Sequence, residues 1–323
     1  MNTRSLPRSP LARSVAAWWP WIRRALVGGF LLLVAFLLVR YARTVDWHDV
    51  LASIRSLPAS VIALAAAFAA ASFLLYTCFD LMGRRYTGHA LGTGQVMQIA
   101  FTSYAFNLNM GSAVGGVGFR LRLYSRLGLA YADIARILTL SMVSNWLGHL
   151  LLAGCLFTFA PLEMPPGWKL DSHGLQLLGI GLLAIVATYL VLCAVSKKRS
   201  WTVRGHTIEL PPARMALLQV GVSALNWMAI AAVIHTLLQG RAEYFPVLSV
   251  LLIAAMAGLI VRVPAGLGVL ETVFIALLSH QVPQGQLLGA LLAYRAIYYI
   301  VPLAFAAVLY LRMELDARRQ RAP

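Results

Sequence analysis

The residues most suited to chemistry lie in the stretch NLNMGSAVGGVGFRLRLYSR, residues 107–126. It contains the glycines Gly111, Gly115, Gly116 and Gly118, followed by Arg120, Arg122 and Tyr124. A guanidinium fork matches the geometry of a phosphate group better than a lysine ammonium does. Glycine accepts unusual backbone angles and lets a ligand approach the chain closely. The combination predicts a turn with a phosphate-binding site beside it.

A second group of charged residues surrounds another turn. Arg262 and Glu271 flank a stretch that contains Pro264, Gly266 and Gly268. We expect Glu271 in the first turn of the next helix, where the helix dipole favours an anion and free N–H groups of residues 267–270 can hold a phosphate. The alternative is a structural ion pair between Arg262 and Glu271 that locks the turn. The residues leave both interpretations open.

Further polar side chains stand within apolar runs. Arg295, in the string Tyr-Arg-Ala-Ile-Tyr-Tyr, is either another phosphate contact or the counter-ion of Glu271. Asp80 and Arg84 have the i,i+4 spacing of a local ion pair on a helix. Asn107, Asn109, Asn145 and His149 are expected to form hydrogen bonds between helices or to be the polar wall of a cavity. No second ligand accompanies His149 at a helical spacing, so we predict no metal site.

The composition explains why charges in these runs matter. Of the 323 residues, 60% are hydrophobic and 12% are charged, and the mean hydropathy is +0.76. These values indicate an integral membrane protein. The net charge of +16 would otherwise suggest nucleic acid as a partner, but the basic residues lie in short loops beside apolar runs. We therefore expect membrane lipids, and no nucleic acid, as partners.

Apolar runs long enough to enter a bilayer occur throughout the chain. They are residues 25–39, 57–79, 95–118, 137–160, 174–195, 215–238, 246–261, 265–279 and 286–311. Because the first run has no small-residue cleavage site after it, we interpret it as an uncleaved anchor.

The distribution of loop charges distinguishes two topologies. If residues 95–118 cross once, 16 lysines and arginines fall on the outer side and nine on the cytoplasmic side. If residues 95–127 enter and leave by the cytoplasmic side, the cytoplasmic loops carry 20 and the outer loops five. The positive-inside rule favours the second arrangement. It predicts a re-entrant hairpin, whose turn must be buried in protein or line a wet cavity.

The same pattern recurs in residues 246–280. The number of membrane crossings before this segment places the entry of a second hairpin on the opposite side of the membrane from the first. The sequence thus predicts an all-α membrane protein with about six full spans and two re-entrant hairpins in an inverted repeat. We expect a basic cytoplasmic tail at 1–24, a membrane domain at 25–311 and a cytoplasmic C-terminal tail at 312–323, in the inner membrane.

The stretches at both turns resemble a known family. The residues that carry the likeness are Gly111, Gly115 and Gly116, the string 120–129 (RLRLYSRLGL), the string 145–148 (NWLG) and the string 263–271 (VPAGLGVLE). They are similar to the transmembrane, flippase-like domain of lysylphosphatidylglycerol synthases and its stand-alone relatives. Ala265 departs from the family's usual glycine. The resemblance implies movement of a phospholipid or modified lipid between leaflets. It does not imply aminoacylation, which in the family belongs to a large soluble domain after the last span, whereas this sequence ends at Pro323.

Three functions were weighed on this basis. The first is a translocator of a phospholipid or of a modified anionic or isoprenoid lipid. It would hold the lipid headgroup on Arg120, Arg122, Tyr124, Arg262, Glu271 and Arg295. The second is a lipid-modifying enzyme, or the membrane subunit of one, that works with a lipid-synthesis enzyme. The third is a scaffold whose arginines only snorkel to the interface or hold the bundle together. The sequence contains no phosphate loop, nucleophile elbow or zinc-binding His-Glu-x-x-His, so we expect neither a cofactor nor an enzyme activity.

Overall fold

The fold is that of a computed structural model, which describes residues 47–160, 172–197, 199–203, 206–261 and 266–319. The chain divides into two units, Met1–His48 and Asp49–Pro323, and all of the arrangement below belongs to the second. The expected tail 1–24, the run 25–39, and the residues Arg262 and Pro264 lie outside the described part.

Helices make up almost all of the described chain, as predicted. The long ones are α3 (Ala59–Thr87), α6 (Tyr131–Phe159), α7 (Ser172–Val195), α8 (Ala213–Leu237) and α9 (Tyr244–Val261). The remaining helices are α2 (Trp47–Arg55), α4 (Thr93–Met110), α5 (Phe119–Arg126), α10 (Val269–Leu278), α11 (Gln284–Arg295) and α12 (Val301–Arg319), of which α4 and α12 have 18 and 19 residues. Two π-helical segments, η1 (Ser112–Gly118) and η3 (Ala296–Ile300), lead into α5 and α12. An antiparallel pair of short strands, β1 (Ser200–Val203) and β2 (His206–Glu209), was not predicted.

Helix α3 shows how the local sequence defines these elements. It begins after Pro58, whose fixed φ suits a helix entry, and ends at Gly88, which has a φ of +72°. The Gly88 N–H donates to the Arg84 carbonyl, as is usual for a left-handed residue at a helix C-terminus. Between them the alanine-rich segment favours a helix through its high propensity.

Six helical segments of the described chain are long and apolar enough to span a membrane. Five of them, in α3, α6, α7, α8 and the continuous α11–η3–α12, coincide with predicted spans. The sixth is α9, which we predicted as the first half of a hairpin. The length and composition of the helices do not show where the bilayer lies. That each hairpin enters and leaves the membrane by the same side therefore stays a prediction.

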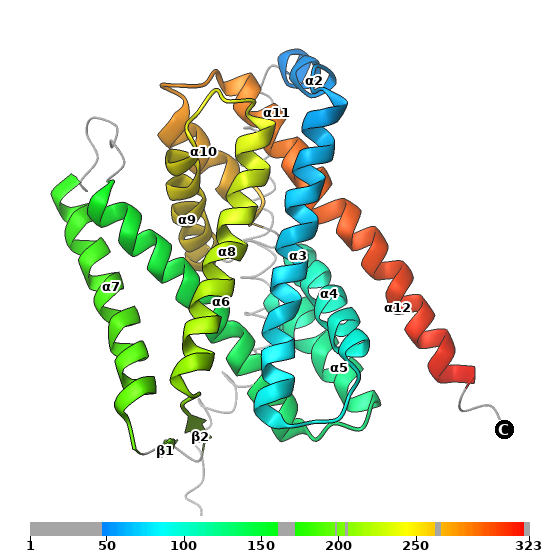
Figure 1. The fold of residues 1–323 in the computed structure, drawn as a ribbon. Coiled ribbons are helices and arrows are strands. Elements are labelled where there is room, and N and C mark those ends of the chain that lie inside the picture. Colours follow the sequence, from blue (N-terminus) through cyan, green and yellow to red (C-terminus); the bar gives the residue numbers. More distant parts are fainter. Residues whose placement is uncertain (1–46, 161–171, 198, 204–205, 262–265, 320–323) are drawn as a thin grey trace, which may run out of the picture. The chain divides into compact units, whose positions relative to one another are not determined.

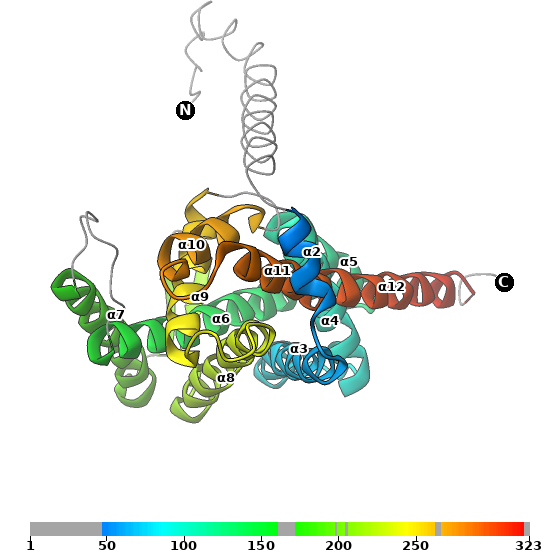
Figure 2. The ribbon, with the colours of Figure 1, turned by 90° about the horizontal axis from the view of Figure 1, so that it is seen from above.

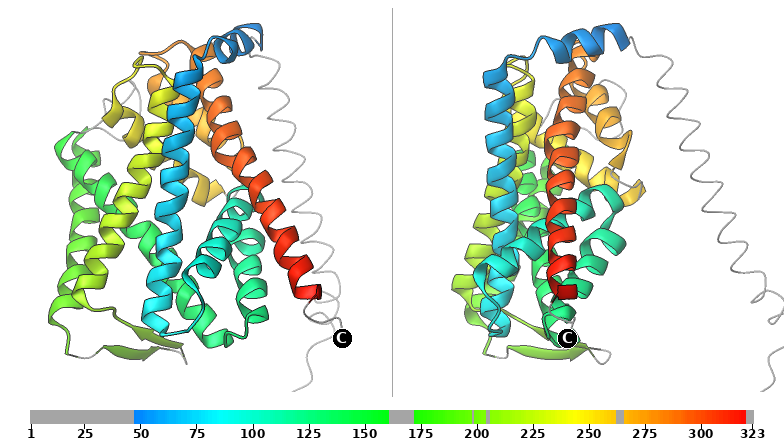
Figure 3. Two further views of the ribbon diagram at one scale, coloured as in Figure 1. Left: turned by 45° about the vertical axis from the view of Figure 1, so that its right-hand side comes forward. Right: turned by 90° about the vertical axis from the view of Figure 1, so that its right-hand side faces the viewer.

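Two helix pairs do turn back within the bundle. Helix α4 packs against η1 and α5, and this first hairpin lies in the lower half of the bundle (Figures 1 and 3). Helices α9 and α10 form the second hairpin, which lies in the upper half (Figure 1). The hairpins therefore start from opposite ends of the bundle, and the end of α4, the end of α9 and the start of α10 lie near its middle (Figure 1).

Glycine is required at the first turn because two backbones meet there. Gly111 has a φ of +84°, in a region that other residues rarely adopt. A Cβ atom on Gly115 would lie 2.3 Å from the backbone nitrogen of Asn107 and from the carbonyl of Phe106. Only glycine therefore allows η1 to lie directly against α4.

The full-length helices surround the hairpins. Viewed from above, α8 lies between α3 and α9, and α7 lies at the periphery beside α6 (Figure 2). The main hydrophobic core joins α3, α8, α9, α10 and α11. By contrast, α7 exposes large apolar side chains such as Leu177, Ile180 and Ile185, as expected for a face toward hydrocarbon.

Candidate functional site between the two hairpins

A pocket of about 320 Å³ lies where the two hairpin turns approach each other. The first hairpin contributes Tyr104, Asn107, Leu108 and Gly111, and the second contributes Gly258, Leu259, Gly266, Val269 and Leu270. The surrounding spans contribute mainly aromatic and amide side chains, namely Asn145, Trp146, Trp227, Tyr294, Tyr298 and Tyr299. A mainly apolar pocket with a few hydroxyl, amide and indole groups in its wall has the composition of a ligand site.

A buried hydrogen-bond chain includes two residues of the pocket wall, Tyr104 and Tyr298. Ser72 donates to the side-chain oxygen of Asn226 at 2.7 Å, so its own oxygen accepts from the Tyr298 hydroxyl at 2.6 Å. Tyr298 in turn accepts from the hydroxyl of Tyr104 at 3.0 Å. The chain connects α3, α8, η3 and the first hairpin. It gives each hydroxyl one defined direction of donation.

Arg295 and Glu271 form a bidentate ion pair behind the pocket wall. The Nη2 atom of Arg295 lies 3.1 Å from Glu271 Oε2, and its Nε atom donates to Oε1. Nη2 also donates to the carbonyl of Gly266 at 3.1 Å. The Arg295 guanidinium lies 5.4 Å from the ring centre of Tyr299. Of the two roles expected for Arg295, the structure therefore confirms the counter-ion of Glu271.

Glu271 has a second partner at the start of α10. Its Oε2 atom accepts from the Gly268 N–H at 3.0 Å, which makes it part of a capping box. Gly268, with a φ of +80°, places the chain for this contact. The predicted position of Glu271 in the first turn of the helix is thus confirmed.

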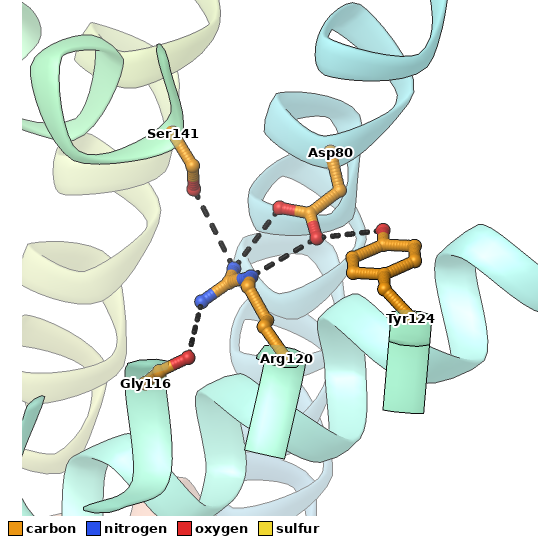
Figure 4. A network of polar contacts seen from close by, with 5 residues as sticks. All are labelled: Asp80, Gly116, Arg120, Tyr124 and Ser141. Carbon is orange, nitrogen blue, oxygen red and sulfur yellow. Dashed lines mark hydrogen bonds and ion pairs between the residues drawn. The ribbon is translucent and has the colours of Figure 1, made fainter. Parts of the chain in front are cut away.

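Arg120 and Asp80 form the other buried ion pair (Figure 4). The Nε and Nη2 atoms of Arg120 each lie 3.0 Å from one carboxylate oxygen of Asp80. The guanidinium also reaches the Gly116 carbonyl at 3.4 Å and Ser141 Oγ at 3.5 Å. Tyr124 donates its hydroxyl to Asp80 at 2.9 Å. The predicted pair of Asp80 with Arg84 is therefore wrong, because the buried carboxylate faces the hairpin.

The more distal arginines of α5 lie apart from the pocket. Arg122 and Arg126 both contact Glu314 of α12, Arg122 at 3.3 Å between Nη2 and Oε2. The Arg122 side chain is 53% exposed, and its guanidinium lies over the ring of Tyr310. Neither residue is brought to the pocket. A role of Arg122 in headgroup binding stays a prediction, at a site separate from the one between the hairpins.

Of the asparagines and the histidine predicted to line a cavity or to join helices, two line the pocket. Asn107 and Asn145 line the pocket. Asn109 instead donates to the carbonyls of Ala105 and Tyr299, so it joins helices. His149 is buried and lies edge-on to both Trp146 and Trp227. The described residues contain no group of three metal-ligating side chains.

Sequence reasoning missed two residues that matter most for this geometry. The spacing of Asp80 favours Arg84 as a local partner, although its position at the end of an apolar run indicates a buried charge. The hydroxyl contact of Tyr104 with Tyr298 joins residues 194 positions apart and has no local signal.

Comparison with known proteins gives a consistent assignment. The family model of the lysylphosphatidylglycerol synthase TM region matches residues 22–306. The chain is 45% identical over 321 residues to the inner membrane protein YbhN of Escherichia coli (strain K12), covering 99% of this chain and 98% of that protein. It is 33% identical over 279 residues to an uncharacterized protein of Synechocystis sp., covering 85% and 86%. It is 22% identical over 287 residues to the phosphatidylglycerol lysyltransferase of Staphylococcus aureus (strain COL), covering 86% of this chain and 32% of that enzyme.

Proposed function

Because the chain belongs to the family of the lysylphosphatidylglycerol synthase transmembrane region, we propose that it moves a phospholipid or a modified lipid between the leaflets of the membrane. In this proposal the headgroup passes through the pocket between the hairpins while the acyl chains stay in the hydrocarbon. The protein acts in the inner membrane, with both termini in the cytoplasm, in keeping with the loop charges and with the name of its Escherichia coli relative.

The position of the pocket is the observation that carries this proposal. Two hairpins from opposite ends of the bundle meet at it, an arrangement that transporters use to place a binding site near the middle of the membrane. Its wall contains hydroxyl, amide and indole groups that can bind a polar headgroup. A translocator needs such a polar surface at the depth where hydrocarbon would otherwise exclude the headgroup.

The pocket also borders surfaces suited to acyl chains. Leu259 lines the pocket and is 54% exposed, and its neighbour Ile260 is more exposed still. On the first hairpin, Met110 and Val114 beside the glycine turn are both exposed. These apolar side chains at the turns allow the acyl chains to remain outside the protein while the headgroup is inside.

The relatives named phosphatidylglycerol lysyltransferase suggest the alternative. They match this chain along only about a third of their own length, so lysyl transfer is a property of those proteins. We propose that this chain is itself no enzyme, and that a lipid-synthesis enzyme supplies its cargo. A lipid-modifying subunit would predict a new lipid species by mass spectrometry instead of an altered distribution between leaflets.

Leaflet exchange in proteoliposomes tests the proposal. Purified protein is reconstituted with dye-labelled phosphatidylglycerol, and exchange is followed by quenching the outer leaflet. Gly258→Phe fills the pocket, because Gly258 lines it and has open space within 4 Å of an added Cβ. Gly181→Phe is the matched control, because Gly181 has equal space on the exposed surface of α7.

We expect wild type and Gly181→Phe to exchange lipid faster than empty vesicles, and Gly258→Phe to exchange it at least tenfold more slowly than wild type. Wild-type protein that matches empty vesicles would remove the proposed function. Equal exchange by Gly258→Phe and wild type would remove the pocket as its route.

A further inference from the structure

We propose that Arg295, and not Arg120, is the residue that binds the phosphate of the lipid headgroup, and that Glu271 is an internal anion which the phosphate displaces. The proposal rests on the proposed lipid site and names the chemistry of its ligand, a phosphodiester. It also makes headgroup binding the event that releases the second hairpin.

The first argument is access to the pocket. The guanidinium of Arg295 contacts the Gly266 carbonyl and the ring of Tyr299, and both of these residues line the pocket. The side chains of Arg295 and Glu271 are each 10% exposed. Val269 and Leu270, next to Glu271 in the chain, also line the pocket. Arg295 is thus in direct contact with two residues of the pocket wall.

The second argument is the contrast with the other ion pair. The side chain of Arg120 is 3% exposed and that of Asp80 is fully buried, against 10% for each member of the pair at the second hairpin. Neither ion pair lines the pocket itself. Arg120 also donates to Gly116 and Ser141, while Asp80 accepts from Tyr124. None of these partners lines the pocket, whereas Gly266 and Tyr299, which contact Arg295, do. Its geometry is that of a structural tie between α3 and the first hairpin.

The third argument is that Arg295 and Glu271 both keep a suitable partner after a phosphate replaces the carboxylate of Glu271 on the guanidinium. A buried arginine without a counter-ion is strongly destabilising, so Arg295 must exchange one anion for another. A phosphate offers the same two-oxygen acceptor geometry as the carboxylate of Glu271. Glu271 in turn keeps the Gly268 N–H and the N-terminus of α10, which favour a carboxylate without Arg295. Both charges therefore stay satisfied in the exchanged state.

The exchange has a mechanical consequence. Helix α10 packs against α11, and the pair Arg295–Glu271 joins these two helices directly. The Arg295 contact with Gly266 also holds the turn of the hairpin. When a phosphate takes the guanidinium, these ties are lost and the second hairpin can move relative to the span that follows it. The ligand thus biases the protein toward the moved state through its differential contacts.

Equilibrium binding in detergent tests this proposal without any transport. Wild type, Glu271→Gln, Asp80→Asn and the neutral double variant Glu271→Gln/Arg295→Gln are titrated with short-chain phosphatidylglycerol, and separately with inorganic phosphate. Glutamine keeps the size of Glu271 and a hydrogen-bond acceptor but removes the competing charge. The neutral pair controls for folding, since it leaves no buried charge uncompensated, and thermal unfolding confirms that each variant is folded.

We expect Glu271→Gln to bind the short-chain lipid at least tenfold more tightly than wild type, and the neutral pair to lose this gain. Asp80→Asn, which removes the counter-ion of Arg120 instead, should show no gain in affinity over wild type. Unchanged affinity in Glu271→Gln, or an equal gain in Asp80→Asn, would overturn the proposal. A gain for inorganic phosphate without one for the lipid would overturn the lipid as the ligand. If wild type exchanges lipid between leaflets but Glu271→Gln shows no increase in lipid affinity, only this inference is overturned. If Glu271→Gln shows the increase but wild type does not exchange lipid, only the proposed function is overturned.

Discussion

Arg120 of the first hairpin donates two hydrogen bonds of 3.0 Å to Asp80 of α3, a residue 40 positions earlier in the chain. Arg295 and Glu271 repeat this arrangement at the second hairpin, with the charges exchanged between hairpin and span. In both pairs the arginine also donates to a glycine carbonyl of the turn, Gly116 or Gly266. Each hairpin is therefore tied to one full-length helix by a buried ion pair.

Removing the charge of Asp80 should destabilise the fold. In Asp80→Asn the buried Arg120 loses its counter-ion, and breaking such a pair costs about 3–5 kcal/mol. Thermal unfolding in detergent, followed by tryptophan fluorescence, measures the loss. Asp133→Asn is the matched control, because Asp133 is 34% exposed and lies 3.9 Å from Arg136, so about 1 kcal/mol or less is expected. Equal stability of Asp80→Asn and wild type would contradict a structural role of the pair.

A methyl group at Gly115 should separate the two arms of the first hairpin. Its Cβ would overlap the backbone of Phe106 and Asn107 at 2.3 Å, and backbone atoms cannot move aside as a side chain can. We expect Gly115→Ala to lower the free energy of unfolding by about 1–3 kcal/mol, the usual cost of overpacking. Gly94→Ala, in an exposed position of α4 with nothing within 4 Å, should change it by no more than about 0.5 kcal/mol. Two variants of equal stability would show that the arms are not in contact.

His89, between α3 and α4, should make stability depend on pH. Partial burial, and then the charge of Arg84, lower its pKa from the ordinary value of 6.5, while Asp133 and Asp80 oppose this shift. The neutral Nδ1 atom accepts a hydrogen bond from the Leu91 N–H. Because the unfolded chain binds the proton more readily, the contribution of His89 is complete above about pH 6.5 and is lost as the pH falls below it.

Thermal unfolding of wild type and His89→Gln between about pH 8 and about pH 5.5 checks this sign. We expect the wild type to lose more stability than the variant over that interval. The measurement at about pH 8 is the control, since His89 is neutral there in both the folded and unfolded states. A steeper loss in His89→Gln would show that the folded state favours the charged ring.

Cysteine labelling should place both ends of the first hairpin on one side of the membrane. In a variant without Cys78, Cys155 and Cys193, single cysteines replace Ala90 before α4, Tyr131 after α5 or Arg241 after α8. We expect an impermeant maleimide to label only Arg241→Cys in spheroplasts, and the other two after permeabilisation, because the charge bias places their loops in the cytoplasm. Labelling of Ala90→Cys and Tyr131→Cys from opposite sides would mean that the stretch crosses the membrane.

Much of the fold could be predicted from local patterns. The apolar runs located five of the spans in the described chain, and the glycines at 111, 115, 116 and 118 located a turn. These features depend on neighbouring residues only, since a span requires about 20 apolar residues and a tight turn requires residues without a Cβ. The same applies to Glu271, whose place in the first turn of α10 follows from the preceding glycine.

The partners of the buried charges were decided by tertiary structure. Local spacing suggested Arg84 for Asp80, yet Arg84 donates to Thr93 at 2.7 Å while Asp80 binds Arg120. Spacing likewise left Arg262 and Arg295 as candidate partners of Glu271. Arg262 lies outside the described residues, and the packing of α10 on α11 brings Arg295 to Glu271. By itself the sequence determined that this chain enters the membrane, which segments do so, and that some of these segments contain charged residues. Which charges meet depended on how distant helices pack, because a buried charge pairs with whatever group the fold brings within hydrogen-bond distance, however far away it lies in the chain.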